Sequence, residues 1–292
     1  MENLSKRANS RPGALLLLLA LAGPLTGCTG GRSGSSAVPP PAPRDTHELL
    51  HATLWVQRAA EFEAAGQQAY ATAEAQLARG LADPTWTAET SQTGGFGGLP
   101  AAVILDVDET VLDNSPFEAR LIRDTANYDS TTWNPWCREE SAEPIPGALE
   151  FCQRAAGRGV TVFYLTNRRE NLREATRRNL IRCGFPMVQG RETVITRADA
   201  DPSDKLGRRQ AIAKDFRIAL LVGDNLGDFI SQDGLSTAER EAVANRYADW
   251  WGTRWIMIPN PMYGDWEQAI LGHERGLSDA EKLSRKRAAL KH

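Results

Sequence analysis

Short apolar runs rich in Val, Ile and Leu recur through the second two-thirds of the chain, and segments with helical spacing of their apolar residues separate most of them. Near-continuous apolar runs are typical of strands in a parallel sheet that is covered on both faces. Alternation of such strands with helices predicts an α/β fold with a mostly parallel sheet. The expected strands are residues 101–107, 159–166, 192–196, 217–224 and 253–260, and the expected helices between them are 147–158, 171–184 and 204–216.

The rest of the chain divides around this core. Apolar residues recur every three to four positions from 46 to 79, which indicates helix, and the Gly-rich stretch 93–100 interrupts the pattern before the first strand. An insertion at about 113–146 is expected to form a small helical lobe, or cap, together with the N-terminal helices. The expected divisions are an N-terminal helical segment at 46–98, an α/β core at 99–276 and a C-terminal tail at 277–292.

The beginning of the chain has a different character. A basic start precedes the apolar stretch 14–25, which is too short to span a bilayer and is typical of a signal sequence. The Leu-Thr-Gly-Cys that ends at Cys28 resembles the cleavage box of bacterial lipoproteins, which implies removal of residues 1–27 and lipidation of Cys28. The Gly-, Ser- and Pro-rich residues 28–45 are expected to be a flexible tether. We therefore expect an outer-membrane lipoprotein, attached to the membrane through its lipid anchor, that faces the periplasm or the surface; an ordinary secretory signal is the alternative.

Composition limits the classes of partner. The chain carries a net charge of -3 with 24% charged and 41% hydrophobic residues, which is typical of a globular protein and gives no indication of nucleic acid as a partner. Three cysteines remain beyond Cys28, and an exported protein could pair two of them. The sequence does not choose the pair among Cys137, Cys152 and Cys183.

Polar groups follow three of the expected strands. The first strand ends in Asp106-Val107-Asp108, and the second ends in Thr166-Asn167-Arg168. The fourth ends in Gly223-Asp224-Asn225, and Asp228 lies four residues after Asp224. Sheets of this kind bind ligands at the carboxyl ends of their strands, so we expect these groups to share one crevice. Carboxylates that lie close together repel, and a bound divalent cation relieves the repulsion. Ligands that are all oxygen favour a hard cation such as Mg²⁺.

Two carboxylates separated by one residue suit phosphoryl transfer. Alternate side chains of a strand point to the same side, so Asp106 and Asp108 are expected to face one phosphate. One carboxylate can attack phosphorus and form an aspartyl-phosphate. The other can give a proton to the leaving oxygen and then take one from water. Mg²⁺ and a lysine would neutralise the phosphoryl oxygens.

Four motifs resemble those of the haloacid dehalogenase superfamily. They are D-x-D-x-T at 106–110, the strand end at Thr166, Lys205, and "GDNLGD" at 223–228. The longer stretches "ILDVDETVLDNSPF", "VFYLTNR", "LLVGDNLGDF" and "IPNPMYGDWE" are similar to the bacterial class C acid phosphatases of the lipoprotein e type, a 5'-nucleotidase family of the DDDD phosphohydrolases. The resemblance covers residues 46–276. It implies a HAD-like, Rossmann-like core and a Mg²⁺-dependent acid phosphatase that acts on phosphomonoesters, including nucleoside 5'-monophosphates, and it leaves a homodimer open.

The resemblance also implies roles for the matching residues. Asp106 is expected to be the nucleophile and a metal ligand. Asp108 is expected to be the general acid and base and to bind the metal through its backbone carbonyl. Asp224 would bind Mg²⁺, and Asp228 would support the metal or orient Lys205. The remaining expected contacts are Thr166, Asn167 and Lys205 with the phosphoryl group, and Trp133 and Tyr263 with the aromatic part of the substrate, Trp136 being a rival to Trp133.

Competing hypotheses fare less well. A calcium-binding EF-hand starting at Asp106 would require Gly at Val111 and Glu at Phe117. Cys152 and Arg158 have the spacing of a cysteine-phosphatase loop, but they lie within an expected helix. A non-catalytic ligand-binding surface lipoprotein with the same fold remains as the alternative, and phosphate release that survives Asp106→Asn would favour it.

Overall fold

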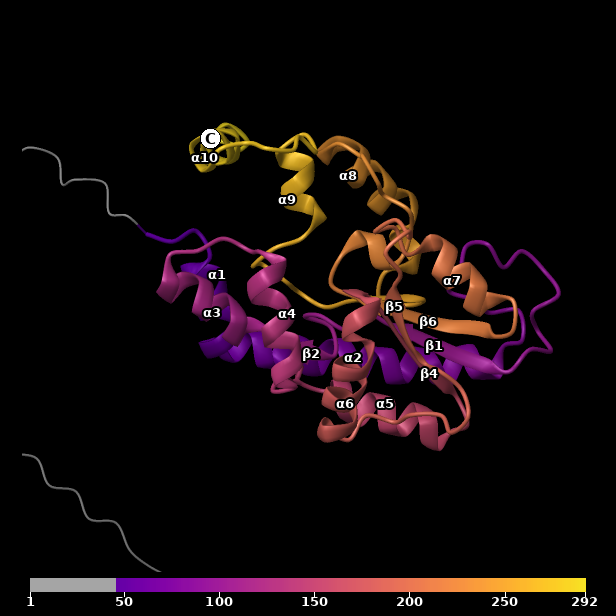
Figure 1. Ribbon diagram of the computed structural model, residues 1–292. Coiled ribbons are helices and arrows are strands. Elements are labelled where there is room, and N and C mark those ends of the chain that lie inside the picture. The colour runs from indigo at the N-terminus through magenta and orange to yellow at the C-terminus, as the bar shows by residue number, and fades with distance from the viewer. Residues whose placement is uncertain (1–45) are drawn as a thin grey trace, which may run out of the picture. The chain divides into compact units, whose positions relative to one another are not determined.

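A five-stranded parallel sheet forms the centre of residues 46–292, the part of the chain that the computed structural model describes (Figure 1). Its strands lie in the order β5-β4-β1-β6-β7, and every neighbouring pair is parallel. The predicted α/β fold is confirmed. The strands are β1 (Ala101–Leu105), β4 (Thr161–Arg169), β5 (Val194–Arg197), β6 (Arg217–Gly223) and β7 (Trp255–Met257). The expected signal sequence, Cys28 and the tether lie outside the described residues.

The two faces of the sheet enter two separate hydrophobic cores. In β1, Val103 and Leu105 belong to the first core, whereas Ala102 and Ile104 belong to the second. Strand β6 is buried at every position. Strand β1, and β6 after its first residue Arg217, are apolar because both faces of the sheet are covered.

Different segments cover the two faces. The first core is closed by α2 (Ala60–Ala82), α5 (Ala148–Gly157) and α6 (Arg173–Cys183). The second core contains Ile212 and Ala213 of α7 (Leu206–Ala213). It also contains Ala88, which lies in the segment that joins α2 to β1. Helices on both faces of the sheet were predicted, but the contribution of this connecting segment was not.

The helical stretch expected at 46–79 consists of two helices, α1 (Leu50–Arg58) and α2. Ala59 between them is extended, with φ -81° and ψ 127°. Helix α1 packs against α3 (Ser115–Asp124), whereas α2 packs against α5 and β6, so the chain changes direction to follow two surfaces. No helix among residues 46–292 is both long enough and apolar enough to cross a membrane.

The predicted insertion forms a small lobe. Its two short strands pair in antiparallel fashion, and two helices lie between them. Of the N-terminal helices, α1 packs on α3 of this lobe, whereas α2 packs mainly on the sheet and α5. The elements of the lobe are β2 (Leu112–Asp113), α3, α4 (Ser130–Glu139) and β3 (Glu143–Pro144). The three described cysteines, Cys137, Cys152 and Cys183, are all free thiols.

The residues expected to form a C-terminal tail contain a helix, α10 (Asp279–Ala288). Ser278 caps it, because its backbone N–H donates to the Glu281 carboxylate at 2.8 Å while its hydroxyl accepts from the Glu281 N–H at 3.3 Å. Lys286 of α10 forms ion pairs with Glu267, at 2.5 Å, and with Glu48. The remaining elements are η1 (Glu170–Leu172), η2 (Leu226–Asp228), α8 (Thr237–Arg246), η3 (Ala248–Trp250) and α9 (Asp265–Ile270).

Candidate active site

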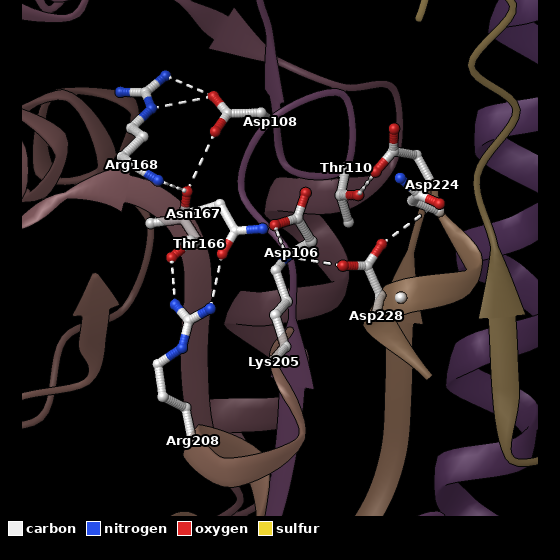
Figure 2. Close-up of polar contacts among 12 residues, drawn as sticks. Asp106, Asp108, Thr110, Thr166, Asn167, Arg168, Lys205, Arg208, Asp224 and Asp228 are labelled. Carbon is white, nitrogen blue, oxygen red and sulfur yellow. Dashed lines mark hydrogen bonds and ion pairs between the residues drawn. The ribbon is translucent and has the colours of Figure 1, made fainter. Parts of the chain in front are cut away.

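The residues predicted for catalysis, metal binding and phosphate binding lie near one another at the carboxyl edge of the sheet (Figure 2). Parallel strands that share a direction end at the same edge, so residues far apart in sequence come together there. Three strands and the start of one helix supply them. Asp106 and Asp108 follow β1, Thr166 and Asn167 lie near the end of β4, Asp224 and Asp228 follow β6, and Lys205 is the N-cap residue of α7.

Three carboxylates form a compact cluster. One oxygen of each of Asp106, Asp224 and Asp228 lies within 4.8 Å of the others. The Nζ atom of Lys205 contacts Asp106 and lies 2.6 Å from Oδ1 of Asp228. A single ammonium group does not balance three carboxylates. An all-oxygen set of this kind fits a hard divalent cation.

Burial alters ionisation in this cluster. It raises the pKa of Asp224 well above its ordinary value, and repulsion by Asp228 and Asp106 adds to the effect. It also raises the pKa of Asp106 to about 7, although Lys205 acts in the opposite direction. Burial disfavours the charged form of Lys205, but attraction by Asp106 and Asp228 outweighs burial and leaves its pKa raised. The cluster therefore has an excess of negative charge that a further cation would stabilise.

Asp108 lies apart from this cluster, although only one residue separates it from Asp106. Its carboxylate accepts hydrogen bonds from Nε of Arg168 at 2.9 Å, Nδ2 of Asn114 at 2.9 Å and Oγ1 of Thr166 at 3.1 Å. The Arg168 side chain is only 1% exposed. One carboxylate thus faces an ammonium group and the other a buried guanidinium, which suits two different chemical roles.

A tight turn follows β1 and sets these two directions. Strand β1 ends at Leu105, earlier than the predicted residue 107. Glu109 has a φ of 56°, a conformation that strains any residue except glycine. Its buried carboxylate accepts from the backbone N–H of Asn114 at 2.8 Å. The Tyr70 hydroxyl of α2 donates to the carbonyl of Thr110 at 2.6 Å, so a helix that packs on the sheet also holds the turn in place.

Arg208 of α7 organises the residues expected to bind phosphate. Its Nη1 donates to the carbonyl of Thr166 at 2.8 Å and its Nη2 donates to Oδ1 of Asn167 at 2.6 Å. With its oxygen held in this way, the Asn167 side chain points toward Asp106 (Figure 2). Asn167 therefore offers N–H donors to the space in front of Asp106, where a phosphoryl group would need them.

Trp133 lies beneath the surface of the lobe. It is 9% exposed, and its ring centroid is 5.0 Å from that of Phe117 and 6.0 Å from that of Tyr128. The guanidinium of Arg168 lies 5.4 Å from the same ring. Trp136, the rival residue, is 3% exposed. Tyr128 is 63% exposed, so it is the aromatic side chain of this group that is open to solvent.

Tyr263 lies on the segment that follows β7 and is partly buried against the first core. In the same segment Asn260 donates from Nδ2 to Asp224 at 2.8 Å, which fixes one oxygen of that carboxylate. Open cavities of 410 Å³ and 550 Å³ flank Asp224. The first is lined by Trp55, Met257, Ile258, Pro259, Asn260 and Pro261 in addition to Asp224.

Sequence reasoning placed Arg168 at the polar end of the second strand but gave it no role, and it did not identify Arg208, Asn114 or Tyr128. A signal was present for the two arginines, because Arg168 directly follows Asn167 and Arg208 lies three residues after Lys205. Arginine is common on exposed surfaces, however, and the sequence alone does not reveal that these guanidinium groups turn into the site.

Comparisons with known proteins agree with this geometry. Residues 41–266 match the family model described as HAD superfamily, subfamily IIIB (acid phosphatase). The chain is similar to the structure of the class C acid phosphatase from Bacillus anthracis, with 35% identity and a TM-score of 0.74 over 84% of this chain and 97% of that one. A tungstate-bound structure of the class C acid phosphatase from Bacillus anthracis gives 33% identity, the same TM-score and the same coverage. Acid phosphatase 1 of Solanum lycopersicum is 29% identical over 166 residues, which are 55% of this chain and 57% of that protein, so the match spans little more than half of the relative.

Proposed function

This chain belongs to the acid phosphatases of the haloacid dehalogenase superfamily, subfamily IIIB, and from that premise we propose that it hydrolyses phosphomonoesters with the aid of Mg²⁺ and through an aspartyl-phosphate. The observation that carries the proposal is the position of Asp106, which contacts Lys205 and faces Asn167, beside an Asp108 with partners of its own. Phosphoryl transfer of this kind needs a nucleophile, an acid and positive charge near the phosphoryl oxygens. Asp106, Asp108 and Lys205 would supply these three groups.

Asp106 is the proposed nucleophile. Its carboxylate oxygen attacks phosphorus, the bond from phosphorus to the leaving oxygen breaks, and an aspartyl-phosphate forms. Water then attacks phosphorus, which releases inorganic phosphate and restores the carboxylate. Lys205 lies against Asp106 and Asn167 points toward it, so both would donate to phosphoryl oxygens during these steps.

Asp108 is the proposed general acid and base. It would protonate the leaving oxygen in the first step and accept a proton from the attacking water in the second. The three hydrogen bonds from Arg168, Asn114 and Thr166 hold its carboxylate in one orientation. A fixed orientation matters because proton transfer requires hydrogen-bond distance to the reacting oxygen.

We propose Mg²⁺ as the cofactor. Asp106, Asp224 and Asp228 supply oxygens close enough to share one cation, and the backbone carbonyl of Asp108 is a further proposed ligand. Asn260 would orient the Asp224 carboxylate. When bound, the cation would neutralise charge on the phosphoryl oxygens.

The proposed substrates include nucleoside 5'-monophosphates. Tyr128 and Tyr263 would lie against the base or another aromatic leaving group, and Trp133 would support Tyr128 from below. Stacking on aromatic rings makes little demand on the identity of a base. A relative that binds tungstate, a tetrahedral oxyanion like phosphate, supports a phosphate ester as the class of substrate.

We also propose that Cys28 carries a lipid anchor and that the enzyme is an outer-membrane lipoprotein facing the periplasm or the surface. The support is the sequence of residues 1–45 alone. Each buried methylene of an acyl chain contributes roughly 0.8 kcal/mol to membrane binding. In this location the enzyme would release phosphate and nucleosides from nucleotides that are too charged to cross a membrane.

Hydrolysis of p-nitrophenyl phosphate at mildly acidic pH tests the proposal. We expect activity that chelation by EDTA abolishes and added Mg²⁺ restores, and a lower KM for nucleoside monophosphates than for short alkyl phosphates. Activity that is indifferent to EDTA would contradict the metal. A folded protein that releases phosphate from none of these esters would favour the non-catalytic ligand-binding lipoprotein.

A further inference from the structure

A buried ion pair lies behind the carboxylate cluster. Nε of Arg209 in α7 donates to Oε2 of Glu89 at 3.0 Å, and both side chains are 0% exposed. Removing two charges from water is costly, and their attraction offsets this cost only where the other polar atoms are also satisfied. Nη2 of Arg209 has no hydrogen-bond partner among residues 46–292. The ion pair is therefore expected to contribute little to the free energy of unfolding, and a role in the neighbouring site would explain it better.

Arg209 reaches the carboxylate cluster through the backbone. Its Nη1 donates to the carbonyl of Gly227 at 3.0 Å and to that of Asp228 at 3.2 Å. Both carbonyls belong to η2, the single turn that carries the Asp228 side chain. The turn has hydrogen bonds of its own, since the N–H of Asp228 donates to the carbonyl of Asn225 at 3.0 Å and the N–H of Asn225 donates to Oδ2 of Asp228 at 2.9 Å. These bonds are local, and the guanidinium adds the hold that fixes the turn relative to α7.

The first turn of α7 also places Lys205 beside the carboxylate of Asp228. The N–H of Arg209 donates to the carbonyl of Lys205 at 2.9 Å, so the two residues are one helical turn apart. Lys205 holds Oδ1 of Asp228 at 2.6 Å, and Arg209 holds the backbone of Asp228. Any shift of α7 relative to η2 would move both contacts together.

Glu89 ties this arrangement to the sheet. Its Oε1 accepts from the N–H and the hydroxyl of Ser91 at 3.2 and 3.1 Å. The preceding residue, Ala88, donates from its N–H to the carbonyl of Ile218 in β6 at 2.7 Å and accepts from Nε1 of Trp255 at 2.9 Å. Glu89 also balances the charge of Arg209, which would otherwise repel a divalent cation bound at the cluster.

We propose that Glu89 and Arg209 are positioning residues for the divalent cation, an inference that rests on the proposed metal-dependent function. Neither residue touches substrate or metal. Arg209 fixes the backbone of η2 so that Asp228 meets Lys205 and the cation together, and Glu89 holds Arg209 in place and cancels its charge. Replacing both residues by apolar side chains of similar size removes the buried charges but leaves the Gly227 and Asp228 carbonyls without their donor.

The test compares Mg²⁺ binding with stability in Glu89→Gln, in the double variant Glu89→Leu/Arg209→Met, and in Arg217→Met as a matched control. Arg217 is also buried, at 6% exposure, and its Nη1 donates to the carbonyls of Gly80, Asp83 and Trp86. It lies at the opposite end of β6, away from the cluster. Calorimetry gives the Mg²⁺ dissociation constant without any turnover, and urea unfolding gives the stability.

We expect Glu89→Gln to be less stable than the double variant Glu89→Leu/Arg209→Met, because it leaves the buried guanidinium of Arg209 without a counter-charge. The double variant should recover stability but bind Mg²⁺ about tenfold to a hundredfold more weakly than the wild type. Arg217→Met should lose stability and keep the wild-type Mg²⁺ affinity. Glu89→Asp, which keeps the charge and shortens the side chain, should give an intermediate affinity.

Wild-type Mg²⁺ affinity in the folded variants of Glu89 and Arg209 would overturn the inference and leave the proposed function intact. A loss of affinity in Arg217→Met equal to that in the double variant would also overturn it, since general destabilisation would then explain both. Wild-type protein that binds no Mg²⁺ would overturn the proposed function and this inference with it.

Discussion

The Nζ atom of Lys205 lies 2.6 Å from Oδ1 of Asp228 and contacts Asp106 on its other side. The ammonium group therefore links the proposed nucleophile to a carboxylate of the proposed metal site. The side chains of Lys205, Asp106 and Asp228 are all buried, with exposures of 7%, 8% and 6%. In such a position a charge acts more strongly than it would in water.

Replacing Lys205 by Met is expected to lower kcat/KM for p-nitrophenyl phosphate by about 10²- to 10³-fold, because phosphoryl charge that develops in the transition state loses its nearest ammonium group. Lys214→Met is the matched control, since Lys214 is an exposed lysine at the C-cap of the same helix. Steady-state kinetics of the two variants decides the matter. A Lys205→Met enzyme within about threefold of the control would contradict the assigned role.

Replacing Asp224 by Asn is expected to weaken Mg²⁺ binding at least tenfold, because one charged oxygen ligand is lost while the size of the side chain is kept. Calorimetric titration of the purified protein with Mg²⁺ measures this directly. Asp215→Asn provides the control, since Asp215 is exposed and belongs to no described cluster of metal-binding residues. Equal affinities in the two variants would remove Asp224 from the metal site.

Truncation of Tyr128 is expected to change substrate binding, whereas truncation of Trp133 is expected to change stability. Tyr128→Ala should raise the KM for nucleoside monophosphates and leave the free energy of unfolding within about 0.5 kcal/mol of wild type, because the side chain is 63% exposed. Trp133→Ala should lower the free energy of unfolding by about 3–5 kcal/mol, because the ring is 9% exposed and packs on Phe117. If only Trp133→Ala altered KM, with stability unchanged, Trp133 would be the substrate contact.

Glu118 is expected to make stability depend on pH. Burial, together with repulsion by Glu267, raises its pKa to about 7 from an ordinary value of 4.5. The folded protein then binds more protons than the unfolded chain between these values, so the free energy of unfolding should fall as pH rises from about 4.5 to 7. The full shift corresponds to about 3 kcal/mol.

Urea unfolding of wild type and Glu118→Gln at both ends of this pH range tests the prediction. The two proteins should have similar free energies of unfolding near pH 4.5, and Glu118→Gln should be the more stable protein near pH 7. Glu61→Gln, at an exposed position, is the control. A variant whose stability falls with pH as steeply as that of the wild type would assign the effect to another group.

Much of the sheet and the site could be predicted from local pattern. Strand β6 is apolar after Arg217 because it is buried on both faces, and the carboxylates after β1 and β6 stand out because a buried strand rarely ends in several acids. The end of β1 could not be predicted as well. Apolar pattern continues to Val107, and the turn that closes the strand depends on contacts made by Glu109 and Tyr70, which are distant from the apolar signal.

The parts that were missed depend on tertiary partners. Ala59 interrupts two helices because α1 and α2 pack on different surfaces, and no local breaker marks the place. Helix α10 forms where Lys286 pairs with Glu267 and with Glu48, and Glu48 lies near the other end of the described residues. The contacts of Arg168 with Asp108 and of Arg208 with Thr166 and Asn167 could be recognised only once the fold was known.

The most direct test of the central claim is the rate of phosphate release by Asp106→Asn compared with wild type, at saturating Mg²⁺ and with the unfolding midpoints of both proteins measured. Asn keeps the shape of the side chain but lacks the nucleophilic carboxylate. The account requires a folded variant whose kcat is lower by at least about a thousandfold. A folded Asp106→Asn protein that releases phosphate within about tenfold of the wild-type rate would contradict it.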